Sequence, residues 1–262
     1  MVNGVGMITL NELSREFTDQ SKNKILALDK VSIEINPGEF LSIVGPSGCG
    51  KSTMLRIIGG LDKPTNGSVL LDGIPVQGPS YERGMVFQDP TLFPWLNVHD
   101  NIAAGLVARK VYKAKKDDVA EYIELVGLKG FEKAYPHHLS GGMEQRAAIA
   151  RSLVNHPKVL LLDEPLGALD AFTRMYMQDE LLRIWQERQN TMILVTHDID
   201  EAVYLSDKIL IMSPRPGRVS NIINVNLPHK RKRNSPDFLN LRNKILEMLH
   251  FVKEDEPLSY YL

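Results

Sequence analysis

The sequence has almost no cysteine, no surplus of charge of either sign and no long apolar run. Cys49 is the one cysteine among 262 residues, so an internal disulfide is impossible and a reducing compartment such as the cytosol is expected. Lys and Arg total 31 against 32 Asp and Glu, whereas a dedicated nucleic-acid binder usually carries a basic excess. No run of about 18 apolar residues could span a membrane, and residues 1–10 lack the pattern of a signal peptide. These absences argue against a secreted, membrane-spanning or nucleic-acid-binding protein.

The composition is that of an ordinary globular chain, with 43% hydrophobic and 24% charged residues, which excludes a disordered or fibrous protein. Short apolar runs predict buried strands at residues 40–44, 159–162, 192–195 and 208–212. A helical pattern at 171–188 lies among them, and strands alternating with helices predict an α/β fold with a mainly parallel sheet. Residues 7–17 and 31–35 alternate more and predict an N-terminal antiparallel β layer.

The length predicts one large domain or a domain with an appendage. Residues 89–156 lack strong strand signals, so we expect a helical subdomain inserted in a domain that spans residues 1–225. An extension follows over 226–262 and opens with the basic run at 229–233. This run fits a solvated linker, which its polar neighbours favour, or a contact with nucleic acid or anionic lipid.

An amphipathic helix is predicted in the same extension. Ser235 can cap it, with Pro236 at its first position. Its apolar stripe consists of Phe238, Leu241, Ile245, Met248, Leu249 and Val252. A helix with such a stripe must pack against something.

The strongest chemical motif follows the predicted strand at 40–44 and precedes a helical pattern. It fits the P-loop pattern G-x-x-x-x-G-K-[ST], whose glycines let backbone N–H groups point at phosphate oxygens while the helix adds its positive end. Lys51 is expected to reach the β- and γ-phosphates, and the Ser52 hydroxyl to ligate Mg²⁺. The alternative is a glycine-rich turn without a ligand. The motif consists of Gly45, Pro46, Ser47, Gly48, Cys49, Gly50, Lys51, Ser52 and Thr53.

A second motif places two carboxylates after the predicted strand at 159–162. Asp163 and Glu164 then lie at the C-terminal end of a strand, where open α/β sheets bind ligands. We expect Asp163 to hold Mg²⁺ through water and Glu164 to polarise the attacking water as a general base. Such a pair alone more often marks a solvated turn, but here it follows a P-loop.

A third motif carries a family resemblance. Leu139, Ser140, Gly141, Gly142 and Met143 open a helical run and resemble the signature motif of ATP-binding cassette (ABC) proteins, whose usual form ends in Gln. Ser140 and the two glycine amides would form a second phosphate cradle at a helix N-terminus. The resemblance implies that this cradle closes over the γ-phosphate of ATP held by another copy of the chain. A simple helix cap with a Gly-Gly turn is the alternative for these residues alone.

Further residues match the ABC pattern one by one. Gln88 resembles the Q-loop glutamine, which implies that it senses Mg²⁺ and the attacking water. His197 resembles the switch histidine that contacts the γ-phosphate, and residues 167–170, which end in Asp170, resemble the D-loop of the dimer interface. Phe17 stands where family members stack an aromatic ring on adenine, although it also fits a sheet core.

The resemblance covers about residues 7–225 and implies a P-loop NTPase (RecA-like) core with ATP and Mg²⁺ as cofactors. Cys49 then occupies a variable P-loop position that tolerates a small residue. Three stretches, 163–174, 196–202 and 212–218, resemble the importer ATPases for nitrate, aliphatic sulfonates and taurine. The regulatory β-domain of the maltose and polyamine type is not expected, because it needs about a hundred residues more.

Such a resemblance implies several partners. The chain would sit peripherally on the cytoplasmic face of the cell membrane, with a second copy of itself and two permease subunits. An external solute-binding protein would act indirectly, and no nucleic acid is expected. The permease would dock near residues 88–96, where Leu92, Phe93, Trp95 and Leu96 form an apolar segment. The alternative is that this segment belongs to the core.

The leading hypothesis is the ATPase subunit of an ABC importer, in which two copies sandwich two ATP molecules and drive a separate permease. One alternative is an importer for another small solute. Another is a soluble ABC protein of translation or DNA repair, which would add a second cassette or a long coiled coil. A P-loop kinase or GTPase is the third, and the guanine-reading Asn-Lys-x-Asp element of a GTPase is missing.

Overall fold

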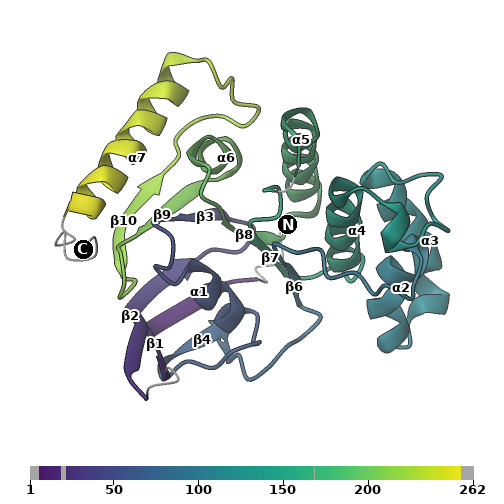
Figure 1. Ribbon diagram of the computed structural model, residues 1–262, viewed down its shortest axis with the longest axis horizontal. Helices are drawn as coiled ribbons and strands as arrows, with labels where there is room; N and C mark the ends of the chain where they lie inside the picture. Colours follow the sequence, from purple (N-terminus) through teal and green to yellow (C-terminus); the bar gives the residue numbers. More distant parts are fainter. Residues whose placement is uncertain (1–5, 19–21, 168, 255–262) are drawn as a thin grey trace. The chain divides into compact units, whose positions relative to one another are not determined.

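The computed structural model describes residues 6–18, 22–167 and 169–254, with side chains described through residue 249. The chain forms two units, one from residues 1–78 with 193–262 and the other from residues 79–192. In Figure 1 the purple strands and the yellow tail helix belong to the first unit, and the teal helices belong to the second. No helix within the described ranges is long and apolar enough to cross a membrane.

The first unit contains a four-stranded antiparallel sheet with the order β2-β1-β4-β5. Ile8 of β1 lies opposite Ile35 on one side and Leu71 on the other, and all three side chains are buried. Alternate residues thus face the core, as in any half-buried strand. The predicted antiparallel layer is confirmed. Its strands are β1 (Ile8–Thr18), β2 (Lys24–Ile35), β4 (Asn66–Leu71) and β5 (Ile74–Pro75).

A second set of strands in this unit has the order β10-β9-β3-β8. β3 and β9 are parallel, and β10 joins β9 antiparallel. Every residue of β3 is buried, Ser42 included, as its largely apolar sequence favours. The predicted strands at 40–44 and 208–212 have these bounds. The strands are β3 (Phe40–Val44), β8 (Thr191–Val195), β9 (Lys208–Met212) and β10 (Val219–Asn224).

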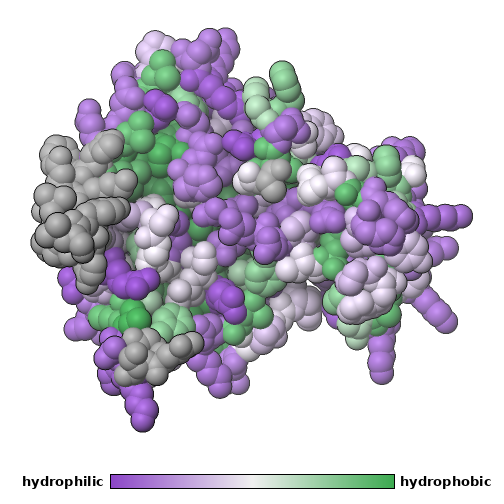
Figure 2. Space-filling model, viewed as in Figure 1, coloured by the Kyte–Doolittle hydropathy of each residue, from purple (hydrophilic) through white to green (hydrophobic). Residues whose placement is uncertain are grey.

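Three helices complete the first unit: α1 (Lys51–Ile58), α6 (Ile199–Leu205) and α7 (Pro236–Glu254). α7 begins at Pro236, as predicted, and packs against α6 with Phe238 and Ile245 fully buried. Most of the surface seen in Figure 2 is hydrophilic, with apolar surface visible beside α7. The side chain of Val252 and residues 255–262 lie outside the described part of the chain.

The expectation of a solvated linker at 229–233 is wrong for three of its five residues. His229 Nε2 lies 3.1 Å from Asp207 Oδ1, and Arg231 is only 6% exposed. The Arg233 guanidinium stacks over the Tyr204 ring at 3.6 Å. The reason is structural, because the end of α6 offers acceptors and an aromatic face to this run. The other two residues are exposed.

The second unit holds the strands β6 (Arg83–Val86) and β7 (Val159–Asp163), which are parallel neighbours. Its helices confirm that residues 89–156 are mostly helical, and α5 has the predicted bounds. They are α2 (Val98–Ala108), α3 (Tyr112–Leu125), α4 (Gly141–Leu153), α5 (Ala171–Arg188) and the 3₁₀ helix η1 (Pro136–His138). α2, α3 and α4 pack together. The predicted domain boundaries stay predictions.

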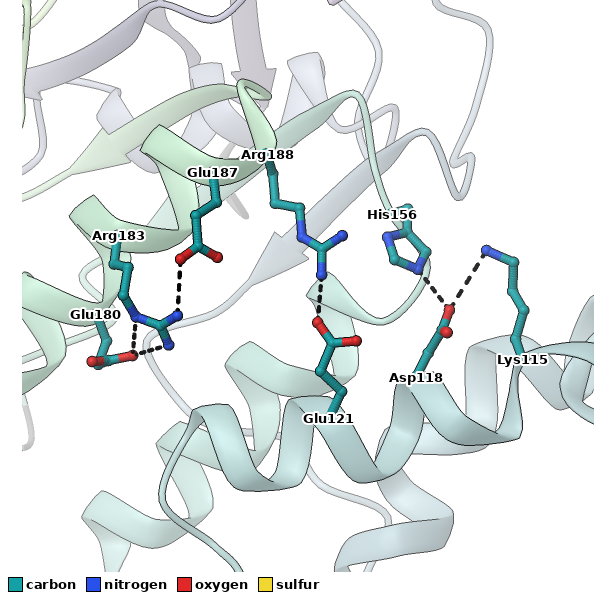
Figure 3. Close-up of polar contacts among 8 residues, drawn as sticks. All are labelled: Lys115, Asp118, Glu121, His156, Glu180, Arg183, Glu187 and Arg188. Carbon is teal, nitrogen blue, oxygen red and sulfur yellow. Dashed lines mark hydrogen bonds and ion pairs between the residues drawn. The ribbon is translucent and has the colours of Figure 1, made fainter.

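Ion pairs connect α3 with other segments of this unit (Figure 3). Arg188, the last residue of α5, pairs with Glu121 of α3 at 2.6 Å. His156 Nε2 lies 2.7 Å from Asp118 Oδ2, which Lys115 also approaches at 3.7 Å. These side chains are partly exposed, so each pair contributes about 0–1 kcal/mol. The pairs orient α3 more than they stabilise it.

Candidate functional site

The P-loop connects β3 to α1, as its sequence predicts. Gly50 is the N-cap of α1 and has a left-handed backbone, with φ 95°. A Cβ at Gly50 would lie 2.6 Å from Leu28 Cδ2 and 2.9 Å from the Ala27 carbonyl oxygen. Any larger residue would therefore be strained twice, by its conformation and by the neighbouring strand. A glycine at position 50 therefore allows the P-loop backbone to adopt this conformation.

Lys51 lies inside this loop and is 8% exposed. Its Nζ donates to the carbonyls of Gly45 at 2.8 Å and Pro46 at 2.9 Å. The ammonium group is thus held at the centre of the loop, where phosphate oxygens could replace carbonyls as its partners. Cys49 is buried beside it, and burial raises the pKa of the Cys49 thiol although the Lys51 charge lowers it. The packing supports the interpretation of Cys49 as a tolerated small residue.

Residues 213–218, which follow β9, support the P-loop, a role that the sequence did not reveal. Arg215 Nη2 donates to the Gly48 carbonyl at 3.4 Å. Gly217 N donates to the Ala27 carbonyl at 2.9 Å, and a Cβ on Gly217 would overlap the Cys49 carbonyl at 1.9 Å. From the sequence alone, residues 213–218 contributed only to the family resemblance. Its Pro and Gly content is the signal for a tight turn that packs closely.

Phe17 and His197 belong to the same unit as the P-loop. The Phe17 side chain, on β1, is 37% exposed, so the interpretation of Phe17 as sheet core is wrong. The Arg15 guanidinium lies 4.5 Å from its ring centroid, so a cation covers one face of the ring. His197 follows β8 and is exposed.

Gln88 and Glu164 meet in the second unit. β6 and β7 are parallel neighbours, so residues after their ends lie close together, and Gln88 Nε2 donates to Glu164 Oε2 at 3.4 Å. Glu164 has φ 46°, a left-handed conformation that costs a non-glycine residue about 1–3 kcal/mol. Such strain gathers at functional sites. Asp163, the last residue of β7, and Glu164 are both half-buried.

Two helix N-termini carry the other predicted residues of this unit. Ser140 caps α4, and its Oγ accepts from Met143 N at 3.3 Å, while Gly141 has open space around it. Asp170 caps α5 by accepting from Phe172 N at 3.1 Å and Thr173 N at 3.0 Å. The hydrogen bonds from Thr173 lower the pKa of the Asp170 carboxyl. Ala168 of the D-loop lies outside the described residues.

Three side chains of α4 hold the segment around Gln88, and sequence reasoning missed all three. Each donates to backbone carbonyls, so none belongs to a recognisable motif. Gln145 is fully buried, which is uncommon for a glutamine and marks it as a residue with a fixed partner. The bonds run from Ser152 Oγ to Met85 O (2.8 Å), from Gln145 Nε2 to Phe87 O (3.1 Å), and from Arg151 to Pro90 O and Thr91 O (2.9 Å each).

A family profile described as ABC transporter matches residues 28–167, which are just over half of this chain. The chain belongs to the ABC transporter family. The aliphatic sulfonates import ATP-binding protein SsuB of Bacillus cereus is 48% identical over 244 residues, 93% of this chain and 96% of that protein. This ABC protein is therefore an ATPase that binds and hydrolyses ATP.

Solved structures of ABC cassettes share the fold of this ABC ATPase. The dimeric post-hydrolysis structure of the ATP-binding cassette MJ0796 bound to ADP and Pi matches with a TM-score of 0.76 and 33% identity, over 84% of this chain and 100% of that one. The structure of cbiO1 from Clostridium perfringens, part of the ABC transporter complex cbiONQ, matches with a TM-score of 0.74 and 27% identity, over 95% and 99% of the two chains. The predicted α/β P-loop NTPase fold is confirmed.

Three residues of the ABC ATPase carry oxygen groups of the kind that ligate Mg²⁺. Ser52 supplies a hydroxyl, Gln88 an amide oxygen and Asp163 a carboxylate, and these are the hard oxygen ligands that Mg²⁺ takes together with phosphates and water. The Gln88 amide nitrogen donates to Glu164, which leaves its oxygen as the atom free to turn toward a cation. The residues present are therefore compatible with a Mg²⁺–ATP substrate.

The apolar segment after Gln88 is a surface feature of the ABC ATPase. Trp95 is 70% exposed and lies with its ring 5.5 Å from that of Phe93, which is 39% exposed. The guanidinium of Arg151, on α4, lies over the Phe93 ring at 5.6 Å from its centroid. The alternative that this segment belongs to the core is wrong for Trp95 and Phe93, while Leu92 and Leu96 are half-buried.

Proposed function

We propose that this ABC ATPase powers the import of a small anionic solute, best supported as an aliphatic sulfonate, through a separate permease. The observation that carries the catalytic part is the contact between Gln88 and the strained Glu164 at the end of β7. The sulfonate part rests on the relative from Bacillus cereus, whose name states that activity and which matches almost end to end.

Catalysis would divide among the site residues as follows. Lys51 would exchange the carbonyls of its loop for the β- and γ-phosphates of ATP. Glu164 would accept the proton of the attacking water, and Gln88 would orient that water through their shared hydrogen bond. His197 would donate a hydrogen bond to the γ-phosphate as negative charge develops on its oxygens. A bound Mg²⁺ would neutralise phosphate charge.

A second copy would complete each site. Ser140 and its neighbouring amides would reach the γ-phosphate held by the partner's P-loop, and Asp170 would lie at the junction of the two copies. The solved MJ0796 cassette is dimeric, which supports this arrangement. The exposed position of Ser140 at the start of α4 supports it further.

Two permease subunits would bind the surface formed by Phe93 and Trp95, with an external binding protein delivering the solute. The assembly of cbiO1 within cbiONQ supports a permease partnership. The site of action would then be the cytoplasmic face of the membrane. Uptake of an alkyl sulfonate by vesicles that contain the ABC ATPase with its permease tests the solute, and uptake of nitrate alone would favour the alternative importer.

Glu164→Gln tests the catalytic proposal. The change keeps the shape and the contact with Gln88 but removes the base, so ATP turnover should fall about 10²–10⁴-fold while ATP binding persists. The uncharged amide should also let two copies stay closed around ATP, which gel filtration with ATP and Mg²⁺ would show as a dimer.

The matched control is Glu187→Gln, on the exposed face of α5, which should leave turnover unchanged. Turnover near that of the parent chain in Glu164→Gln would remove Glu164 from the mechanism.

A further inference from the structure

His197 stands between the end of β8 and the first turn of α6. Asp198 N donates to Thr196 Oγ1 at 3.0 Å, and Asp198 Oδ1 accepts from Glu201 N at 3.1 Å. The Thr196 hydroxyl and Asp198, which flank His197, are thus bound to the start of α6, so we expect a shift of this helix to move the imidazole. α6 spans seven residues, and a helix that short is not stable alone in water. Its position must come from its neighbours.

Arg231 supplies donors for the free end of α6. The last carbonyls of any helix lack partners within the helix. The Arg231 guanidinium donates to the carbonyls of Val203 (2.5 Å), Tyr204 (3.2 Å) and Ser206 (2.8 Å), and it also donates to the carbonyl of Leu227 (3.1 Å). One side chain from the tail therefore satisfies several acceptors at the end of α6. Nη1 makes the three contacts with α6, while Nε and Nη2 donate to the Leu227 carbonyl, so the planar guanidinium connects α6 with the start of the tail.

Two further contacts from the tail reach α6 along its length. The Arg233 guanidinium stacks on the Tyr204 ring at 3.6 Å. Arg242 of α7 pairs with Asp200, in the first turn of α6, at 2.9 Å. The two fully buried side chains of α7 complete the packing between these helices. The tail thus holds both ends of the helix that follows His197, as the adjacent α6 and α7 in Figure 1 illustrate.

We propose that the tail segment 231–245 positions His197 for ATP hydrolysis by fixing α6, and that Arg231 is its principal positioning residue. The inference rests on the proposed role of His197 at the γ-phosphate. The proposal gives the basic run at 229–233 a structural role. A solvated linker, or a contact with nucleic acid or lipid, would need exposed side chains, whereas Arg231 is turned inward and is 6% exposed. Burial lowers the pKa of Arg231, with Asp207 opposing this.

Arg231→Met tests the proposal, because methionine fills much of the volume without any donor. The ATPase kcat should fall about tenfold, whereas the Kd for ATP should change less than about twofold, since the P-loop contacts remain. Arg231→Lys, which keeps three donors but not their planar arrangement, should recover part of kcat. Lys232→Met is the matched control, since Lys232 belongs to the same basic run but is exposed, and it should leave kcat unchanged.

The decisive measurement repeats Arg231→Met in a His197→Ala background. If Arg231 acts through His197, the second substitution should lower kcat no further. A tenfold loss that persists without His197 would show a merely structural role and would overturn the proposal. An unchanged kcat in Arg231→Met would overturn it as well.

His197→Ala alone separates this inference from the proposed function. If that variant keeps the kcat of the parent chain, the role of His197 fails and the inference fails with it. If it loses activity while Arg231→Met does not, only the inference fails. Should Arg231→Met not fold, Arg233→Leu and Arg242→Met remove the two milder contacts, and a loss of kcat that disappears in the His197→Ala background is again the expected result.

Discussion

Lys51 illustrates how the fold places a single charged residue within the P-loop. Its ammonium is nearly buried and donates to two carbonyls of its own loop, so the charge is already positioned where phosphates bind. An ammonium in such a position is stable because these carbonyls stand in for the lost water. The motif predicted the charge, and the structure adds the two carbonyls that hold it.

Lys51→Ala should therefore weaken ATP binding as well as hydrolysis. A hydrogen bond to a charged group contributes about 1.5–3 kcal/mol, so the Kd for ATP should rise roughly 10–100-fold. Isothermal titration calorimetry measures this directly. Lys63→Ala, at an exposed position of the same unit, is the control and should bind ATP like the parent chain. Unchanged affinity in Lys51→Ala would refute the P-loop assignment.

The residues that sequence could predict are those whose chemistry depends on a local pattern. Glu164 was predictable because a strand and an acidic pair are adjacent in the chain. Arg231 and Gln145 were not predictable, because their partners are backbone carbonyls that lie 25–28 and 58 residues away. No spacing in the sequence marks a carbonyl that lacks a partner. Such residues are found only once the ends of the helices and strands are placed.

At the scale of elements, α4 links two predicted features of the second unit. It begins at Ser140, and three of its side chains hold the backbone from residue 85 to residue 91. Its Arg151 also faces the Phe93 ring. A movement of the signature end of this helix would therefore reach both Gln88 and the exposed aromatic pair. Under the proposed function, this connection would couple ATP at Gln88 to a permease bound at the aromatic pair.

Trp95→Ala tests whether the aromatic pair binds the permease. Replacing a buried core Trp with Ala lowers the free energy of unfolding by about 3–5 kcal/mol. Trp95 is 70% exposed, and surface substitutions usually change this free energy by no more than about 0.5 kcal/mol. The isolated subunit should thus stay folded, with a small shift in Tm and intact basal ATPase, while co-purification with the permease and transport should fall.

Val107→Ala, an exposed apolar residue of α2, is the control for a general effect of surface apolarity. A folded Trp95→Ala variant that assembles and transports normally would exclude Trp95 as a docking residue.

The most buried strands were predictable, whereas β4 and β10 were not. β3 and β9 are nearly continuous apolar runs because almost all of their residues are buried, and such runs are visible in sequence. Both β4 and β10 contain Asn and Ser, and most of their residues are not buried. They are strands because β1 and β9 offer them partners, which is a tertiary cause. A sequence pattern indicates which strand residues are buried more directly than it indicates which strands pair with each other.

For the whole molecule, the distribution of functional residues over two units matters most. The P-loop, Phe17 and His197 belong to the first unit, and Gln88, Glu164 and Ser140 belong to the second. Ser140 and the neighbouring Gly141 face open space at the start of α4. A phosphate cradle that is exposed in this way can serve a second copy, which is the arrangement that the ATP-sandwich proposal needs.

Ser140→Arg tests whether that cradle acts on the partner copy. The long side chain would fill the space at the start of α4, so the variant should bind ATP through its own P-loop but should fail to dimerise and hydrolyse. Mixing it with Lys51→Ala gives heterodimers with one doubly damaged site and one intact site. The intact site of such a heterodimer should restore part of the ATPase activity, provided that one site suffices. Each variant alone at twice the concentration is the control and should stay inactive. If Ser140→Arg instead abolishes ATP binding by the single chain, the cradle acts within its own chain and the two-copy site is refuted.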